Sequence, residues 1–148
     1  MTPTHLVIEF CAEGVAGRAR LEWASEPLIC QALVDATPFV VRSHHAIYSG
    51  SEVAAVCPDL GQLPSNTATT EVAVGDVAYA YLLARDHYGV ENDFAEICWF
   101  YDRDARPSMF GGPFPVSVFA RLERAEAFLA ASKRMRIEGA KEIRVSTQ

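Results

Sequence analysis

The sequence predicts a single mainly β domain in which mostly antiparallel strands close into a barrel with a helix over each open end. Several short segments alternate apolar and polar residues, which is the period of half-buried strands. Only two segments have helical apolar spacing. No linker, repeat or low-complexity tract interrupts the 148 residues, so one domain over residues 1–148 is expected. Closing the sheet would remove its exposed edges, which favours a barrel.

The first half of the chain predicts strands around one helix. His5–Cys11 and Arg18–Trp23 both alternate in twos and are joined by a short turn with two glycines, which is typical of an antiparallel pair. Glu26–Asp35 carries an apolar helical stripe; Ser25 suits its N-cap, and Pro38 ends the helix. Two further strands are expected, over Phe39–Tyr48 and Ser51–Cys57.

The second half predicts more strands and the second helix. A polar loop is expected over Pro58–Thr69 and a long irregular segment, rich in glycine and proline, over Asp102–Pro115. Glu123–Glu138 has helical spacing, and Gly139 suits its C-terminal cap. Val116–Leu122 is compatible with a strand or with the start of that helix. The remaining strands are expected over Glu71–Val74, Val77–Leu83, Phe94–Tyr101 and Glu142–Thr147.

Composition excludes several classes of protein. A net charge of −6, with one basic cluster at residues 133–136 in the second predicted helix, argues against a nucleic-acid or membrane-surface binder. No apolar run reaches the roughly 20 residues that span a bilayer, and the first residues lack a signal-peptide pattern, so a cytoplasmic protein is expected. The four cysteines have no metal-ligand spacing, so neither a metal nor a cofactor is predicted.

The order of elements is similar to that of the cyclophilin-like barrel. Several segments resemble an uncharacterised bacterial branch of that superfamily, the domain of unknown function 3830, over nearly the whole chain. The segments that carry the resemblance are His45–Gly50, Gly75–Tyr79, Glu96–Tyr101, Gly112–Pro113 and Val118–Leu122. The resemblance implies a cyclophilin-like fold and no particular activity.

Cyclophilins are peptidyl-prolyl isomerases, and this implies one candidate catalytic residue. Their arginine on the strand after the first helix polarises the prolyl amide, and Arg42 occupies a comparable place. A fixed cation there would stabilise the twisted amide. The run that follows the cyclophilin arginine is replaced here by SHHAIYSGSEVAAV, so the pocket glutamine has no counterpart. The alternative for Arg42 is a surface arginine paired with a carboxylate such as Glu52.

Glu96 is the second candidate, because it is a carboxylate in an otherwise apolar strand. It shares a face with Phe94, Cys98 and Phe100, where an unpaired charge is costly. It is expected either to pair with an arginine, Arg42 or Arg121, or to anchor a cationic or hydrogen-bonding ligand.

Histidines and aromatic residues complete the predicted pocket. His44 and His45 point to opposite faces of a regular strand, so they cannot both bind one metal there. Aromatic residues of the Gly/Pro loop would be exposed unless a ligand or a subunit covers them. The predicted pocket residues are Arg42, His44, His45, Tyr48, Glu96, Trp99, Tyr101, Phe110 and Phe119.

Three functions remain open from the sequence. The first is binding of a small molecule or a short peptide in this pocket, in a protein that self-associates as a homo-oligomer. The second is an enzyme, either a prolyl isomerase that uses Arg42 or a hydrolase that uses a His/Glu pair. The third is a structural homo-oligomer whose aromatic loop is all interface.

Overall fold

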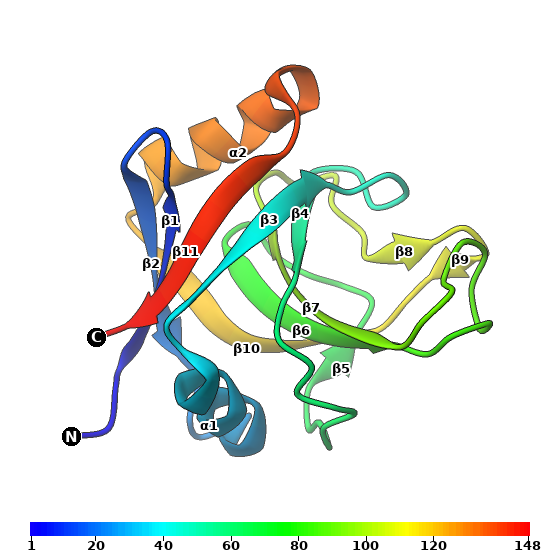
Figure 1. Ribbon diagram of the computed structural model, residues 1–148, viewed down its shortest axis with the longest axis horizontal. Coiled ribbons are helices and arrows are strands. Elements are labelled where there is room, and N and C mark those ends of the chain that lie inside the picture. The colour runs from blue at the N-terminus through cyan, green and yellow to red at the C-terminus, as the bar shows by residue number, and fades with distance from the viewer.

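The computed structural model describes residues 1–148 as a closed antiparallel β-barrel with two helices (Figure 1). The helices are α1 (Pro27–Ala36) and α2 (Glu126–Glu138). The strands are β1 (His5–Phe10), β2 (Val15–Leu21), β3 (Phe39–His45), β4 (Glu52–Val56), β5 (Ala68–Thr69), β6 (Asp76–Leu82), β7 (Phe94–Phe100), β8 (Ser108–Met109), β9 (Gly112–Pro113), β10 (Val116–Glu123) and β11 (Lys141–Thr147). Neither helix is long and apolar enough to cross a membrane.

Eight strands form the barrel, in the order β2-β1-β11-β3-β4-β7-β6-β10, and the pairing of β10 with β2 closes it. All of these pairings are antiparallel. The two-residue strand β5 pairs with Val116 and Ser117 at the start of β10, and β8 and β9 form a separate small hairpin. The prediction of a mainly β, closed antiparallel barrel with two helices is therefore confirmed.

The helix α2 covers one end of the barrel, and its inner face meets aromatic residues of the core (Figure 1). Trp99 on β7 has no exposed surface and donates its indole N–H to the Ser132 hydroxyl at 2.9 Å. The ring of Phe128 stacks on that of Phe10, with centroids 5.0 Å apart. Gly17 on β2 lies beneath this ring, since a Cβ there would come within 2.7 Å of Phe128.

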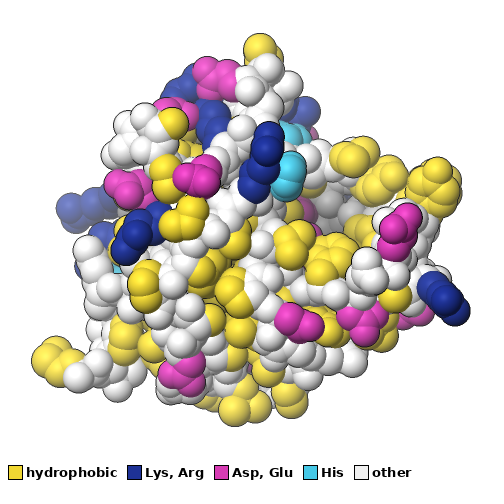
Figure 2. Space-filling view, viewed as in Figure 1, with side chains coloured by type: hydrophobic (Ala, Val, Ile, Leu, Met, Phe, Trp, Pro, Cys, Tyr) yellow, Lys and Arg dark blue, Asp and Glu magenta, His cyan; other side chains and the backbone are white.

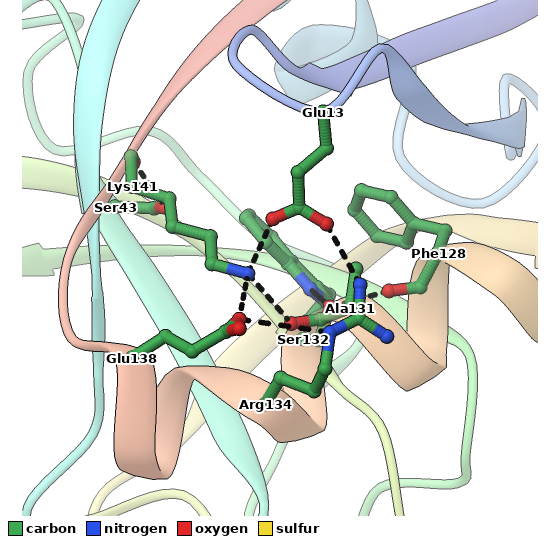
Figure 3. Close-up of polar contacts among 9 residues, drawn as sticks. Glu13, Ser43, Phe128, Ala131, Ser132, Arg134, Glu138 and Lys141 are labelled. Atoms are coloured by element: carbon green, nitrogen blue, oxygen red, sulfur yellow. Dashed lines mark hydrogen bonds and ion pairs between the residues drawn. The ribbon is translucent and has the colours of Figure 1, made fainter.

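An ion-pair network joins the C-terminal half of α2 to the turn between β1 and β2 (Figure 3). The ammonium of Lys141 donates to the carboxylates of Glu13 and Glu138, the latter at 2.7 Å. Arg134 donates to Glu13 at 2.7 Å as well. These contacts and the aromatic packing fix α2 over its end of the barrel.

The helix α1 lies at the opposite end, and its start differs from the sequence prediction. Ser25 does not cap it; Glu26 holds the N-cap position without a side-chain cap bond. The Glu26 carboxylate instead accepts hydrogen bonds from loop residues 65–67. The local sequence does not show that Glu26 accepts hydrogen bonds from a loop about 40 residues away. The end of the helix before Pro38 is as predicted.

The structure corrects the prediction for one further segment and decides between two alternatives for another. Glu71–Val74 is not a strand, because the Asp76 side chain binds the backbone N–H of Ala73 at 2.9 Å and holds a turn there. The short strand β5 precedes it instead. Val116–Leu122 is a strand rather than the start of α2, and it extends to Glu123.

A second apolar layer covers the outer face of β6 and β7. Their outward side chains form a buried cluster with residues of the segments that follow β6 and β7, including Val90 and Ala105. The segment between β7 and β10, predicted as irregular, contains the β8–β9 hairpin and packs over this face. The outer side of the barrel is therefore enclosed at this place rather than open to solvent.

Candidate functional site

The candidate site is a cavity of about 240 Å³ on the outer side of the barrel, between β4, β7 and the loops beside them. Figure 2 shows a hollow next to β3 and β4, with hydrophobic side chains along its rim. Strand alternation turns Glu52, Ala54 and Val56 outward on β4, and Glu96 outward on the neighbouring β7. The lining residues are His44, His45, Ala46, Ile47, Tyr48, Ser49, Glu52, Ala54, Val56, Leu82, Phe94, Glu96, Ser108 and Met109.

Glu52 is the most unusual residue of the cavity. Its side chain is buried, with 5% relative exposure, and its Oε1 has no hydrogen-bond partner. Burial and, to a smaller extent, the negative charge of Glu96 raise the pKa of this carboxyl to about 8, against a weaker effect of the Ser49 hydroxyl. A buried polar atom without a partner is costly, so this oxygen has a hydrogen-bonding capacity that the protein leaves unused.

Glu96 lies on the same face, opposite Val56 on β4 and Ala80 on β6. It is half-buried, and burial raises its pKa to about 7. A carboxyl with such a pKa changes its protonation near neutral pH, and perturbed groups of this kind cluster at functional sites.

The arginine pairings expected from the sequence are wrong. Arg121 pairs with Glu22 at 3.2 Å and with Asp76 at 3.6 Å, because its strand turns it away from β7. Arg42 is exposed on β3 and makes no ion pair with Glu52 or Glu96, because it lies outside the cavity lining. Both glutamates of the cavity are therefore without an arginine.

The two adjacent histidines of β3 both line the cavity. His44 lies opposite Ala54, a lining residue of the cavity. The ring of His45 turns toward the barrel end, where its Nδ1 donates to the Ala46 carbonyl at 2.8 Å. Its Nε2 shares a hydrogen bond of 2.6 Å with the Tyr101 hydroxyl, and Arg136 donates to the Tyr101 oxygen at 2.7 Å. The direction at Nδ1 follows from the Ala46 carbonyl, which can only accept.

Tyr48 lines the cavity, and aromatic side chains from two further loops lie beside it. The ring of Phe110 lies 6.0 Å from that of Tyr48 and 5.2 Å from that of Tyr88. All three are exposed, as is Ile47. This aromatic rim, defined as Tyr48, Tyr88 and Phe110, gives the cavity an apolar entrance.

The structure separates the nine residues predicted for the pocket. His44, His45, Tyr48 and Glu96 line the cavity, and Phe110 stands at its rim. Trp99 and Phe119 lie in the barrel core with no exposed surface, and Tyr101 lies behind His45.

The sequence analysis does not predict Glu52 as a pocket residue and names it only as a possible ion-pair partner of Arg42. One signal could have identified it, since it is the one charged residue of the strand EVAAV and has the same outward parity as Ala54.

A larger hollow of about 590 Å³ lies elsewhere, on the outer face of β1, β2 and β10. Its carboxylate, Glu123, is already satisfied, since it accepts from His5 and from Arg20, both at 2.8 Å. Its three arginines, Arg18, Arg20 and Arg124, are exposed. We therefore place the candidate site at the smaller cavity, where a buried polar group lacks a partner. No three His, Cys, Asp or Glu side chains are grouped to hold a metal ion.

Comparison with known proteins assigns a family and a fold. The family described as "Protein of unknown function (DUF3830)" matches residues 8–147. No curated protein matches the chain. The structure of McbB in complex with tryptophan is similar, with a TM-score of 0.70 and 15% identity over 95% of this chain and 44% of McbB, so this chain spans less than half of that protein. The solution structure of the hypothetical protein AF2241 from Archaeoglobus fulgidus has a TM-score of 0.64 and 19% identity, over 99% of this chain and 96% of AF2241.

Proposed function

We propose that this chain, which belongs to the DUF3830 family, is a small-molecule-binding protein whose ligand occupies the outer cavity between β4 and β7. The observation that carries the proposal is the buried Glu52 Oε1, which has no donor within the protein. A ligand that donates a hydrogen bond to it would remove the cost of leaving that oxygen unsatisfied. The volume of about 240 Å³ suits a small compound.

The walls of the cavity support the same proposal. They combine apolar side chains, such as Val56, Leu82 and Phe94, with a few polar groups, which is the usual composition of a ligand site. At 15% sequence identity, the similarity of this chain to McbB concerns the fold alone. That McbB binds tryptophan is compatible with a small ligand here. A short peptide is a less suitable ligand, since the cavity is small.

Isomerase activity and self-association stay predictions. The candidate Arg42 lies outside the cavity lining, so the cavity does not favour a prolyl isomerase. The exposed rim would suit a subunit contact as well as a ligand, and a measurement of mass in solution would decide that point.

Binding can be tested with two small aromatic probes, phenethylamine and phenethyl alcohol, followed by amide NMR shifts. We expect shifts centred on Ala54 and Glu96, and we expect Ala54→Leu to abolish them by filling the cavity. Ala12→Leu, the same change in an exposed turn, is the control and should bind both probes as before. The proposal is overturned if neither probe binds, or if Ala54→Leu binds as well as the unchanged protein.

A further inference from the structure

The charged side chains that line the outer cavity are both acidic. Glu52 and Glu96 come from neighbouring strands, and no lysine or arginine lines the cavity. Arg136 is used behind the site, where it donates to Tyr101 at 2.7 Å and to Ser51 at 3.2 Å. The protein therefore places two carboxyl groups at one apolar cavity and supplies no lysine or arginine for either.

From this arrangement we infer, on the basis of the proposed function, that the ligand is a primary ammonium compound whose cation binds at Glu52, in the cavity that Glu96 also lines. An ammonium group has three donors and no acceptor, so it can donate to the unsatisfied Glu52 Oε1, while Glu96, four register positions away on the neighbouring strand, adds negative charge to the same cavity. Its positive charge offsets a carboxylate charge that the apolar walls would otherwise destabilise.

The aromatic rim indicates what the rest of this ligand is like. Tyr48 lines the cavity, and the exposed rings of Phe110 and Tyr88 lie next to it in turn, so they offer an aromatic surface that packs well against an aromatic or aliphatic body. They also attract a cation that passes through the entrance. The inferred class is therefore a small amine with an apolar body.

Binding of such a cation would release a proton. Burial keeps the pKa of Glu52 at about 8 and that of Glu96 at about 7, so the free site holds protons near neutral pH. A cation in this cavity lowers both pKa values, and its affinity therefore rises from about pH 6 to about pH 8. The other titratable groups that face the pair are the side chains of His44, His45, Tyr48, Cys57 and Cys98.

The two probes differ in the group that the inference concerns. Phenethylamine carries an ammonium at neutral pH, whereas phenethyl alcohol has the same ring and chain with a hydroxyl. By isothermal titration calorimetry we expect the amine to bind at least about tenfold more tightly at pH 8, a difference of about 1.4 kcal/mol. Its binding heat should change with the ionisation enthalpy of the buffer, as proton release requires.

Matched variants test which residues cause the preference for the amine over the alcohol. Glu52→Gln and Glu96→Gln should each remove most of the preference for the amine, whereas Glu142→Gln, an exposed carboxylate on β11, should keep it. Circular dichroism would confirm that each variant is folded.

The inference is overturned, and the proposed function stands, if both probes bind equally well to the unchanged protein. A preference for the amine that persists in both cavity variants also overturns it. If neither probe binds, the proposed function itself fails.

Discussion

Two buried glutamates at different places in the barrel have opposite surroundings. Glu26 at the start of α1 and Glu52 on β4 are 1% and 5% exposed. The Glu26 carboxylate accepts from the hydroxyls of Ser65 and Thr67 at 2.7 and 2.6 Å, and from the backbone N–H groups of Asn66 and Thr67. Glu52 Oε1 accepts from no group of the protein.

The difference in hydrogen bonding reverses the effect of burial on the two pKa values. Burial raises the pKa of Glu26, but its hydrogen bonds outweigh burial and the pKa is lowered. Burial, with a smaller contribution from the nearby Glu96, raises the pKa of Glu52 to about 8. Burial alone therefore does not mark a functional carboxylate. The satisfied one holds a loop, and the unsatisfied one retains the capacity to bind a donor.

The strongest test of this comparison is Glu26→Ala. We expect a loss of about 3 kcal/mol in the free energy of unfolding at pH 7, because the hydroxyl and backbone donors of residues 65–67 lose their charged acceptor. Urea denaturation measures it, with the exposed Glu142→Ala as control. Since its folded pKa is lowered, the contribution of Glu26 is present above the unfolded pKa and is lost as the pH falls. A loss below about 1 kcal/mol at pH 7 would contradict this role.

The fold could be predicted from the sequence because its determinants are local. Alternation in twos located most of the strands, including β1, β7 and β11, and the stripes located both helices. Glu71–Val74 was misassigned because the Asp76 side chain, not the strand period, decides where the backbone N–H groups of this segment bond. Ser25 was misassigned as a cap because Glu26 serves a loop 40 residues away in the chain.

The site could be predicted only in part, because it depends on pairing between distant segments. Alternation alone placed Glu96 on an apolar face, but it separated His44 from His45, and both of these line the cavity. It could not show that β4 pairs with β7 and brings Glu52 to the same cavity. Nor could it show that Arg42 and Arg121 face elsewhere, since that follows from the closure of the barrel.

Removing the charge of the unsatisfied carboxyl should have the opposite effect on stability. We expect Glu52→Gln to stabilise the protein by about 2 kcal/mol at pH 9, where the native carboxyl must ionise in an apolar site. The folded pKa is raised, so the stability of the unchanged protein is complete below the unfolded pKa and is lost as the pH rises through about 8. Denaturation at pH 5 and pH 9 should show the gain only at the higher pH. An equal gain in stability at pH 5 and pH 9 would contradict a raised pKa for Glu52.

Glu96→Gln should produce a smaller gain of about 1 kcal/mol at pH 9, because this side chain is only half-buried. It should also lower the pKa of Glu52 from about 8, since it removes the negative charge of its neighbour. A carbon-detected NMR titration of the Glu52 carboxyl would follow this change. An unchanged Glu52 pKa would show that the two carboxyls do not interact across the cavity.

The smallest effect is expected at the ion-pair network of Figure 3, where the carboxylates are satisfied but more exposed. Lys141→Met should cost less than about 1 kcal/mol, because Arg134 still pairs with Glu13 and with Glu138. The loss should shrink in high salt, which screens exposed charges. Lys133→Met, an exposed lysine of α2, is the matched control and should change stability less. A loss as large as that of Glu26→Ala would mean that partly exposed carboxylates stabilise this fold as much as the buried Glu26 does. It would contradict the view that a hydrogen-bonded carboxylate contributes more when it is buried.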